Sequence, residues 1–144
     1  MINYKNCSVI ALLMSVNTSF AESEKVEVMH FWTSGGESKA LSYIKDELEE
    51  QNYVWKDSPI AGGGGENAKT VLRARIASGT PPSAMLILGQ EILDWGNEGL
   101  LSSIQNNANT KEWDLVLSDE VKKFTKIDGE YVSIPTNIHR INMV

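Results

Sequence analysis

The sequence holds little cysteine, little histidine and fewer basic than acidic residues. Its 144 residues include one cysteine, Cys7, so no disulfide can form within the chain, and a hydrophobic core has to stabilise the fold. With 13 lysines and arginines against 19 acidic residues, the net charge is −6, and no basic face for nucleic acid is expected. The two histidines, His30 and His139, stand far apart without carboxylates at ligand spacing, which argues against a metal site.

The chain also lacks a hydrophobic run that could cross a membrane. The apolar run at Cys7–Val16 (CSVIALLMSV) is shorter than the roughly 20 residues that a bilayer requires. Lys5 precedes it, and small residues follow it up to Ala21. This layout predicts a cleavable secretory signal over residues 1–21, with a buried N-terminal helix as the alternative. Because Cys7 stands at the start of the apolar run and not after it, it does not fit a lipid anchor, and we expect an exported, periplasmic protein.

Strand-like and helix-like segments alternate along the remainder. The hydrophobic patterns predict three strands, four helices and a hairpin, followed by another strand-like stretch over Ser133–Val144. The strands are Lys25–Trp32, Tyr53–Ala61 and Ala84–Leu88; the helices are Ser34–Gln51, Asn67–Ser78, Glu91–Glu98 and Glu112–Lys123; the hairpin is Phe124–Ile134, turning at Asp128-Gly129. This order predicts an α/β fold with a mainly parallel sheet and helices on both faces. In such sheets ligands bind at the carboxyl ends of the strands, here after Trp32, Ala61 and Leu88.

Two of these segments carry more detailed expectations. In the helix Ser34–Gln51, Leu41, Ile44 and Leu48 fall on one face and should be buried. Ser34 and Glu37 stand in the order of a capping box at its start. The run Ala84–Leu88 is wholly apolar, which is typical of a strand buried on both faces. His30 should be a core histidine with its hydrogen bonds satisfied.

Residues Gly63–Thr70 come within one residue of the phosphate-binding pattern G-x-x-x-x-G-K-[ST]. Ala68 replaces the second glycine, and Glu66 brings a negative charge to a loop that would hold an anion. Phosphate or nucleotide binding is therefore the weaker alternative. The glycines serve better as a turn with positive φ angles and close backbone approach, while Lys69 and Arg73 should be solvated.

Four segments together resemble a known family. They are HFWTSGGE (30–37), AGGGGENAKTVLRARIASGTPP (61–82), ILDW (92–95) and IPTNIHRIN (134–142). In this order they resemble the carbohydrate-binding solute-binding proteins of bacterial ABC transporters, with the glucose/mannose-type proteins as the nearest branch. The resemblance implies a type II periplasmic-binding-protein fold, in which two α/β lobes close on one sugar.

The resemblance also implies a domain assignment. Residues 22–144 would form the first lobe, incomplete and ending near the first crossing toward the second lobe. Two interpretations stay open: a piece of a longer protein, or a truncated, non-functional remnant of one. The implied function is capture without catalysis, so no enzyme activity and no cofactor are expected. A monosaccharide such as glucose would be bound by a monomer in the periplasm and delivered to the membrane permease.

The implied sugar site begins at an aromatic pair and a nearby glutamate. The family positions match Phe31, Trp32 and Glu37, and Gln90 is the nearest polar candidate after the third strand. A pyranose stacks its C–H faces on an indole and pairs its hydroxyls with a carboxylate. Trp32 could instead pack in the core, Glu37 could cap its helix, and Gln90 could face solvent. Relatives often have a second tryptophan at the position of Phe31 and polar residues where Met85–Leu88 is apolar, which leaves the identity of the sugar open. Three further tryptophans are expected to be packing residues: Trp55, Trp95 and Trp113.

Overall fold

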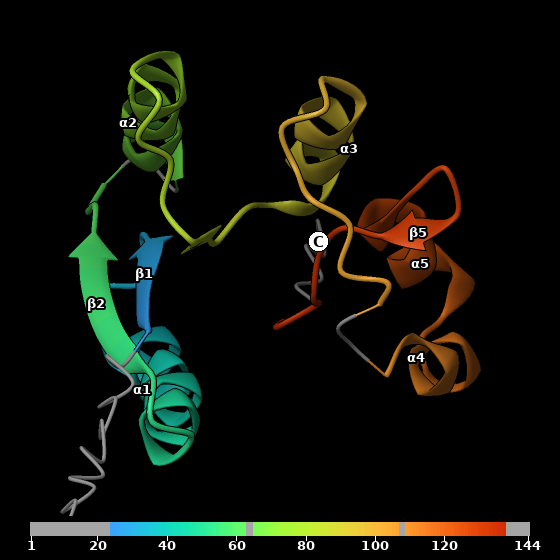
Figure 1. The fold of residues 1–144 in the computed structure, drawn as a ribbon, viewed down its shortest axis with the longest axis horizontal. Helices are drawn as coiled ribbons and strands as arrows, with labels where there is room; N and C mark the ends of the chain where they lie inside the picture. The colour runs from blue at the N-terminus through green and yellow to red at the C-terminus, as the bar shows by residue number, and fades with distance from the viewer. Residues whose placement is uncertain (1–23, 63–64, 107–108, 138–144) are drawn as a thin grey trace, which may run out of the picture.

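The computed structural model describes residues 24–62, 65–106 and 109–137. The predicted signal sequence, the glycines 63 and 64, and His139 lie outside these ranges. The elements in chain order are β1 (Lys25–His30), α1 (Gly35–Glu50), β2 (Val54–Pro59), α2 (Glu66–Ala77), β3 (Ala84–Met85), α3 (Gly89–Asn97), α4 (Thr110–Val116), α5 (Asp119–Thr125), β4 (Lys126–Ile127) and β5 (Glu130–Tyr131) (Figure 1).

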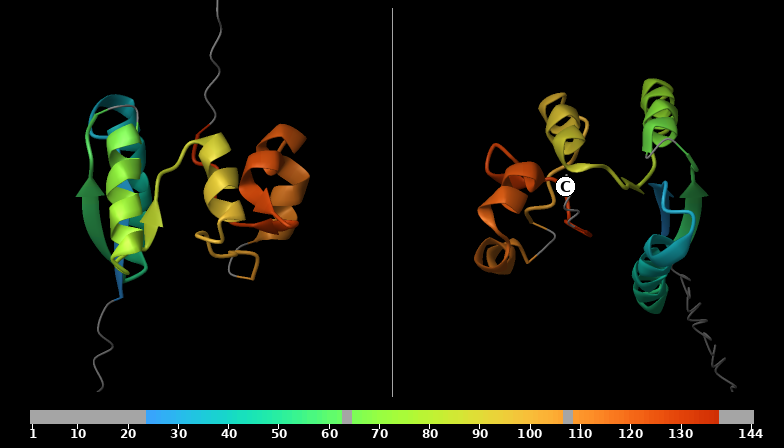
Figure 2. Two further views of the ribbon diagram at one scale, coloured as in Figure 1. Left: turned by 90° about the horizontal axis from the view of Figure 1, so that it is seen from above. Right: turned by 180° about the vertical axis from the view of Figure 1, so that it is seen from behind.

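The first three strands form a parallel sheet in the order β2-β1-β3, which confirms the predicted α/β class. Successive side chains of β1 point to opposite faces. Met29 packs in a core cluster with Leu72 of α2, whereas His30 lines a pocket with Leu41 of α1. The two helices therefore cover opposite faces of the sheet (Figures 1 and 2). Pro59, at the end of the edge strand β2, is tolerated because an edge residue need not donate to a neighbour.

The α2 face of the sheet carries the hydrophobic core. Met29, Leu72 and Trp95 are almost fully buried there, so α3 contributes to the same core through Trp95. Partly buried apolar residues complete it: Ile60, Val71, Ile76, Met85 and Leu101. The expectation that Trp95 is a packing residue is confirmed.

The third strand is shorter and less buried than its sequence predicts. β3 holds only Ala84 and Met85, Ala84 is exposed, and Leu88 is 46% exposed. The predicted strand over Ala84–Leu88, buried on both faces, is therefore wrong. β3 lies at the sheet edge, and after Leu86 donates its N–H to the carbonyl of Met29 at 2.9 Å the chain turns away to begin α3.

The single helix predicted over Glu112–Lys123 is two helices, α4 and α5. Leu117 is extended between them, and the Ser118 side chain accepts a hydrogen bond from the N–H of Val121, which starts α5 anew. The predicted hairpin is confirmed: β4 and β5 pair antiparallel, and both turn residues are left-handed, with φ of 51° at Asp128 and 86° at Gly129.

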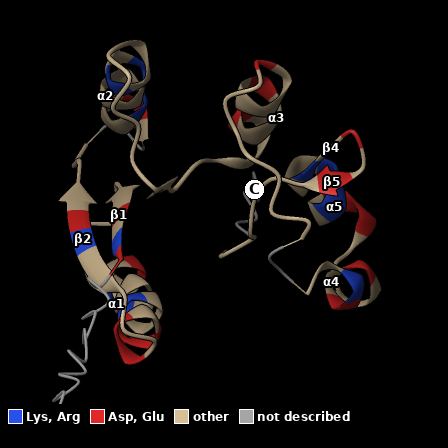
Figure 3. Cartoon of the chain, in the orientation of Figure 1, with Lys and Arg blue, Asp and Glu red and all other residues tan. Residues whose placement is uncertain are grey.

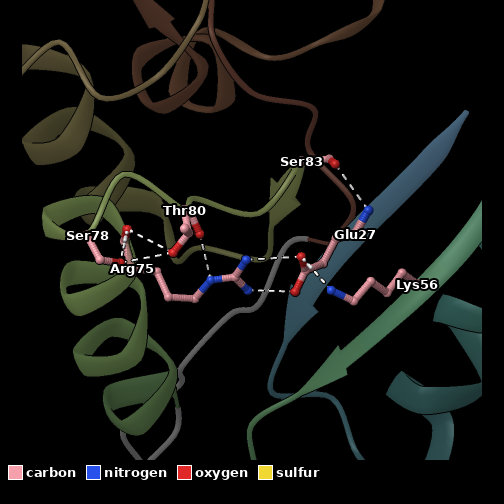
Figure 4. Close-up of polar contacts among 6 residues, drawn as sticks. All are labelled: Glu27, Lys56, Arg75, Ser78, Thr80 and Ser83. Atoms are coloured by element: carbon pink, nitrogen blue, oxygen red, sulfur yellow. Dashed lines mark hydrogen bonds and ion pairs between the residues drawn. The ribbon is translucent and has the colours of Figure 1, made fainter.

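Charged residues gather at two places in the fold, on the surface of α1 and around Glu27. Acidic residues, red in Figure 3, are frequent in α1, and Asp46, Glu47, Glu49 and Glu50 are all exposed. Between β1, β2 and the last turn of α2, Glu27 is bound by Arg75 and Lys56 (Figure 4). Within the described ranges, no helix is both long enough and apolar enough to cross a bilayer.

Candidate functional site

Trp32 and Glu37 flank the point where the chain leaves the carboxyl end of β1. β1 is the central strand: its own connection leads through α1 to β2 on one side, and the connection from β2 returns through α2 to β3 on the other side. Such a switch point is where open α/β sheets bind ligands. Trp32 is only 6% exposed, Phe31 is half-buried, and Glu37 lies exposed in the first turn of α1.

The predicted capping box at the start of α1 does not form. Ser34 occupies the N-cap position, yet its side chain makes no capping hydrogen bond, and only its carbonyl accepts the N–H of Ser38 at 3.4 Å. The next residue, Gly35, has a left-handed φ of 65°, so the chain enters the helix along a path that a capping box does not follow.

Phe31 packs directly on the glycine turn before α2. A Cβ at Gly65 would lie 3.1 Å from Phe31 Cε1, and Gly65 has a φ of 105°. The interpretation of the glycines as a turn with positive φ and close approach is therefore confirmed at Gly65. Asn67 Nδ2 closes the turn by donating to the carbonyl of Ala61 at 3.0 Å. These contacts bring the carboxyl end of β1 to the start of α2.

Replacing Gly65 with alanine is expected to destabilise the protein by about 1–3 kcal/mol, because it combines left-handed strain with a clash on the Phe31 ring. Gly79→Ala is the matched control, since Gly79 has a φ of 72° but a Cβ added to it would meet no other atom within 4 Å. Urea denaturation followed by circular dichroism measures both variants. Equal losses would show that the ring contact contributes nothing.

Lys69 is not solvated, contrary to expectation, whereas Arg73 is exposed as expected. The Lys69 side chain is 15% exposed, and its ammonium pairs with Glu66 at 2.5 Å and with Glu91 of α3 at 2.6 Å. The hydrogen bond to Glu66, followed by that to Glu91, raises the pKa of Lys69. Arg73 lies with its guanidinium carbon 5.5 Å from the centre of the Trp95 ring. Because two carboxylates hold the amine that a phosphate would need, this arrangement does not support nucleotide binding.

Gln90 lies exposed in the first turn of α3.

Only one of the two ring nitrogens of His30 has a hydrogen-bond partner within the described residues. The His30 Nε2 atom lies 2.9 Å from Asp57 Oδ1, while its buried Nδ1 has no partner within the described residues, so the expected satisfied histidine is half correct. Across the same ranges, no group of three histidine, cysteine or acidic side chains could hold a metal ion.

Two pockets lie away from the predicted sugar residues. One, of about 190 Å³, lies between α1 and the strands β1 and β2. The other, of about 240 Å³, lies beside α4. Neither is lined by Phe31, Trp32, Glu37 or Gln90. The sequence interpretation missed the first pocket; its lining is His30, Ser38, Leu41, Ser42, Lys45, Trp55 and Asp57. The signal that could have revealed it is the helical spacing of Ser38, Ser42 and Lys45 around Leu41.

No protein-family model matches the chain. A probable sugar-binding periplasmic protein of Rhizobium meliloti (strain 1021) is 43% identical over 141 residues, which are 98% of this chain and 34% of that protein. A protein of the same description from Brucella suis biovar 1 is 41% identical and matches 94% of this chain and 32% of its own length. The chain thus spans about a third of the length of the curated relatives it matches.

Two further matches are more distant in sequence. An ABC substrate-binding protein from Listeria monocytogenes, in complex with cycloalternan, superposes with a TM-score of 0.58 at 22% identity, over 76% of this chain and 28% of that one. This match supports the type II solute-binding fold. A glucose-binding protein of Saccharolobus solfataricus is 27% identical over 121 residues, covering 78% of this chain and 22% of that protein. Together the matches confirm the resemblance that the four sequence segments indicated.

Proposed function

We propose that this chain, a relative of periplasmic sugar-binding proteins, is the first lobe of the substrate-binding component of an ABC sugar importer. The observation that carries the proposal is the 43% identity to a probable sugar-binding periplasmic protein over 98% of this chain. Residues 1–21 would direct export to the periplasm and be removed. Residues 22–144 would bind the sugar with a second lobe and dock on a membrane permease, without any catalytic step.

The ligand would sit at the carboxyl end of β1. Trp32 would offer its indole to the C–H face of a pyranose, Glu37 would accept hydrogen bonds from hydroxyls, and Phe31 would support the site from the glycine turn. Gln90, at the start of α3, would supply an amide from the far side of the switch point. Since Trp32 is 6% exposed, the sugar would contact only the small part of the indole that reaches the surface.

A monosaccharide of the glucose type is the proposed ligand. The glucose/mannose-type sequence segments and the distant glucose-binding relative support this choice. One carboxylate and one indole suit a single pyranose ring, whose hydroxyl rim and apolar face they complement.

Saturation-transfer NMR on the 144-residue chain is expected to show transfer to the ring protons of D-glucose or D-mannose. Glu37→Gln should weaken binding about tenfold, because a hydrogen bond to a charged acceptor contributes about 1.5–3 kcal/mol. Trp32→Phe should reduce the transfer by removing the larger ring. Glu47→Gln, on the exposed acidic side of the same helix, is the matched control and should change nothing. No transfer to any hexose, or equal affinities in the Glu37 and Glu47 variants, would refute the proposal.

A further inference from the structure

The side of α1 that faces the sheet is polar where a helix normally places its apolar stripe. Ser38, Leu41, Ser42 and Lys45 recur at positions i, i+3, i+4 and i+7 and line the pocket together. Leu41 is buried, whereas Ile44, which the sequence pattern assigns to the buried face, is 40% exposed. The two serines are too small to fill the space beneath the helix, and a pocket of about 190 Å³ remains.

The opposite wall comes from the strands. Trp55 and Asp57 are two residues apart on β2, so both side chains point to the same face of the sheet. This is the α1 side, to which His30 of β1 also points. Trp55 Nε1 donates to Asp57 Oδ1 at 3.0 Å, and His30 Nε2 lies 2.9 Å from the same oxygen. Burial raises the pKa of Asp57, but the hydrogen bonds from Trp55 and His30 outweigh it and keep the pKa below its ordinary value. The carboxylate is therefore ionised, and because both bonds fall on Oδ1, neither of them occupies Oδ2 as an acceptor.

The pocket lining holds one ammonium group, that of Lys45, and one carboxylate, that of Asp57. The Lys45 ammonium also lies 3.8 Å from Glu49 Oε1, outside the lining. An anionic ligand would meet Asp57, and a cationic ligand would meet Lys45. A neutral ligand is repelled by neither charge, and its hydroxyls can donate hydrogen bonds to the carboxylate and accept them from the ammonium. The volume equals that of about six waters, at roughly 30 Å³ each, and lies below the roughly 300 Å³ of drug-sized pockets.

We infer that this pocket is a second ligand site, which binds a small neutral polyol or monosaccharide between Trp55, Asp57, Ser42 and Lys45. The indole of Trp55 takes the C–H face of the ligand, and Asp57 and Lys45 take its hydroxyls. The site is separate from the one proposed at Trp32 and does not depend on it.

The test follows the indole N–H signals of the ¹⁵N-labelled chain during titration with D-glucose. The Trp55 signal should shift and saturate, because its N–H binds Asp57 at the pocket, while the signal of Trp95, which is buried in the core and lines neither pocket, stays in place as an internal control. Trp32 reports independently on the sugar site of the proposed function. A saturable shift of Trp55 alone supports the second site and counts against the first; a shift of Trp32 alone does the reverse. Sodium acetate shifting Trp55 where glucose does not would overturn the assignment to a neutral ligand.

Two variants locate the site. Lys45→Gln should weaken the Trp55 response about tenfold through loss of a charged hydrogen-bond donor, whereas Lys39→Gln on the same helix should leave it unchanged. Ser42→Leu should fill the pocket, abolish the response and raise the melting temperature, which also shows that the variant folds. An unchanged Trp55 response in Lys45→Gln or in folded Ser42→Leu would overturn the inference.

Discussion

Replacing Tyr131 with alanine is expected to lower the free energy of unfolding by about 3–5 kcal/mol, as other large aromatic truncations in cores do. Tyr131 is fully buried, and its ring lies edge-on to Trp113 with the centroids 5.2 Å apart. Its hydroxyl donates to Asp114 Oδ1 at 2.9 Å, and the Lys126 ammonium lies 4.3 Å from its ring centre. One side chain thus joins the hairpin to α4, and its removal leaves a cavity, while Asp114 Oδ1 keeps the Lys126 ammonium at 2.6 Å.

Chemical denaturation followed by circular dichroism measures this loss. Tyr131→Phe keeps the ring and removes the hydroxyl, so it should cost about 1 kcal/mol, the net contribution of one hydrogen bond. Tyr43→Ala is the matched control on the surface, because Tyr43 is 66% exposed, and it should change stability by less than about 0.5 kcal/mol. Similar losses for the Tyr131 and Tyr43 alanine variants would show that the α4–hairpin unit does not unfold with the sheet.

Local sequence patterns were sufficient where one segment determines its own structure. The Asp128-Gly129 pair predicts a two-residue turn with left-handed angles, and the structure has one. The alternation of apolar strands with amphipathic helices predicts a parallel sheet, which β1, β2 and β3 form. The positive φ and close approach at Gly65 follow from glycine chemistry alone.

Sequence patterns failed where the burial of a segment depends on the element that it packs against. Ala84–Leu88 reads as a buried strand, but its exposure depends on the edge position of β3, which no local pattern encodes. Ile44 fits the apolar stripe of α1, yet the helix presents Ser38 and Ser42 to the sheet, because the polar side chains of Trp55 and Asp57 stand opposite them. Helix orientation is set by the surface that the helix meets.

The candidate sugar site shows the same division. The position of Trp32 after the central strand could be predicted from the order of elements, and the sheet order places that strand end at a switch point. The burial of Trp32 could not be predicted, because it depends on packing around the indole. The Lys69–Glu91 pair was also unforeseen, since it joins α2 to α3 across 22 positions of sequence. The roles of Trp32, Phe31, Glu37 and Gln90 stay predictions.

Acidification is expected to weaken the fold through Glu27. Arg75 donates to both of its carboxylate oxygens, at 2.6 and 3.0 Å, and Lys56 donates to one at 3.1 Å. The hydrogen bond from Arg75 is the largest cause that lowers the pKa of Glu27 from 4.5 to about 2, against the opposing effect of burial. A carboxyl with a lowered pKa contributes stability above its unfolded pKa, and that contribution is lost as the pH falls toward the folded value.

Between about pH 5 and pH 2 the protein should therefore lose on the order of 2 kcal/mol from this carboxyl, after allowance for partial solvent screening. Glu27→Gln should show most of that loss already at neutral pH, because the carboxylate that binds Arg75 and Lys56 is gone. For the same reason, the stability of this variant should depend less on pH in the acid range. Glu120→Gln is the control, since Glu120 pairs with Lys123 at 2.9 Å on the surface and is 77% exposed. Urea midpoints across the pH range measure all three proteins. A Glu27→Gln profile parallel to that of the unmodified chain would mean that other carboxylates, and not the β1–β2–α2 junction, govern its acid stability.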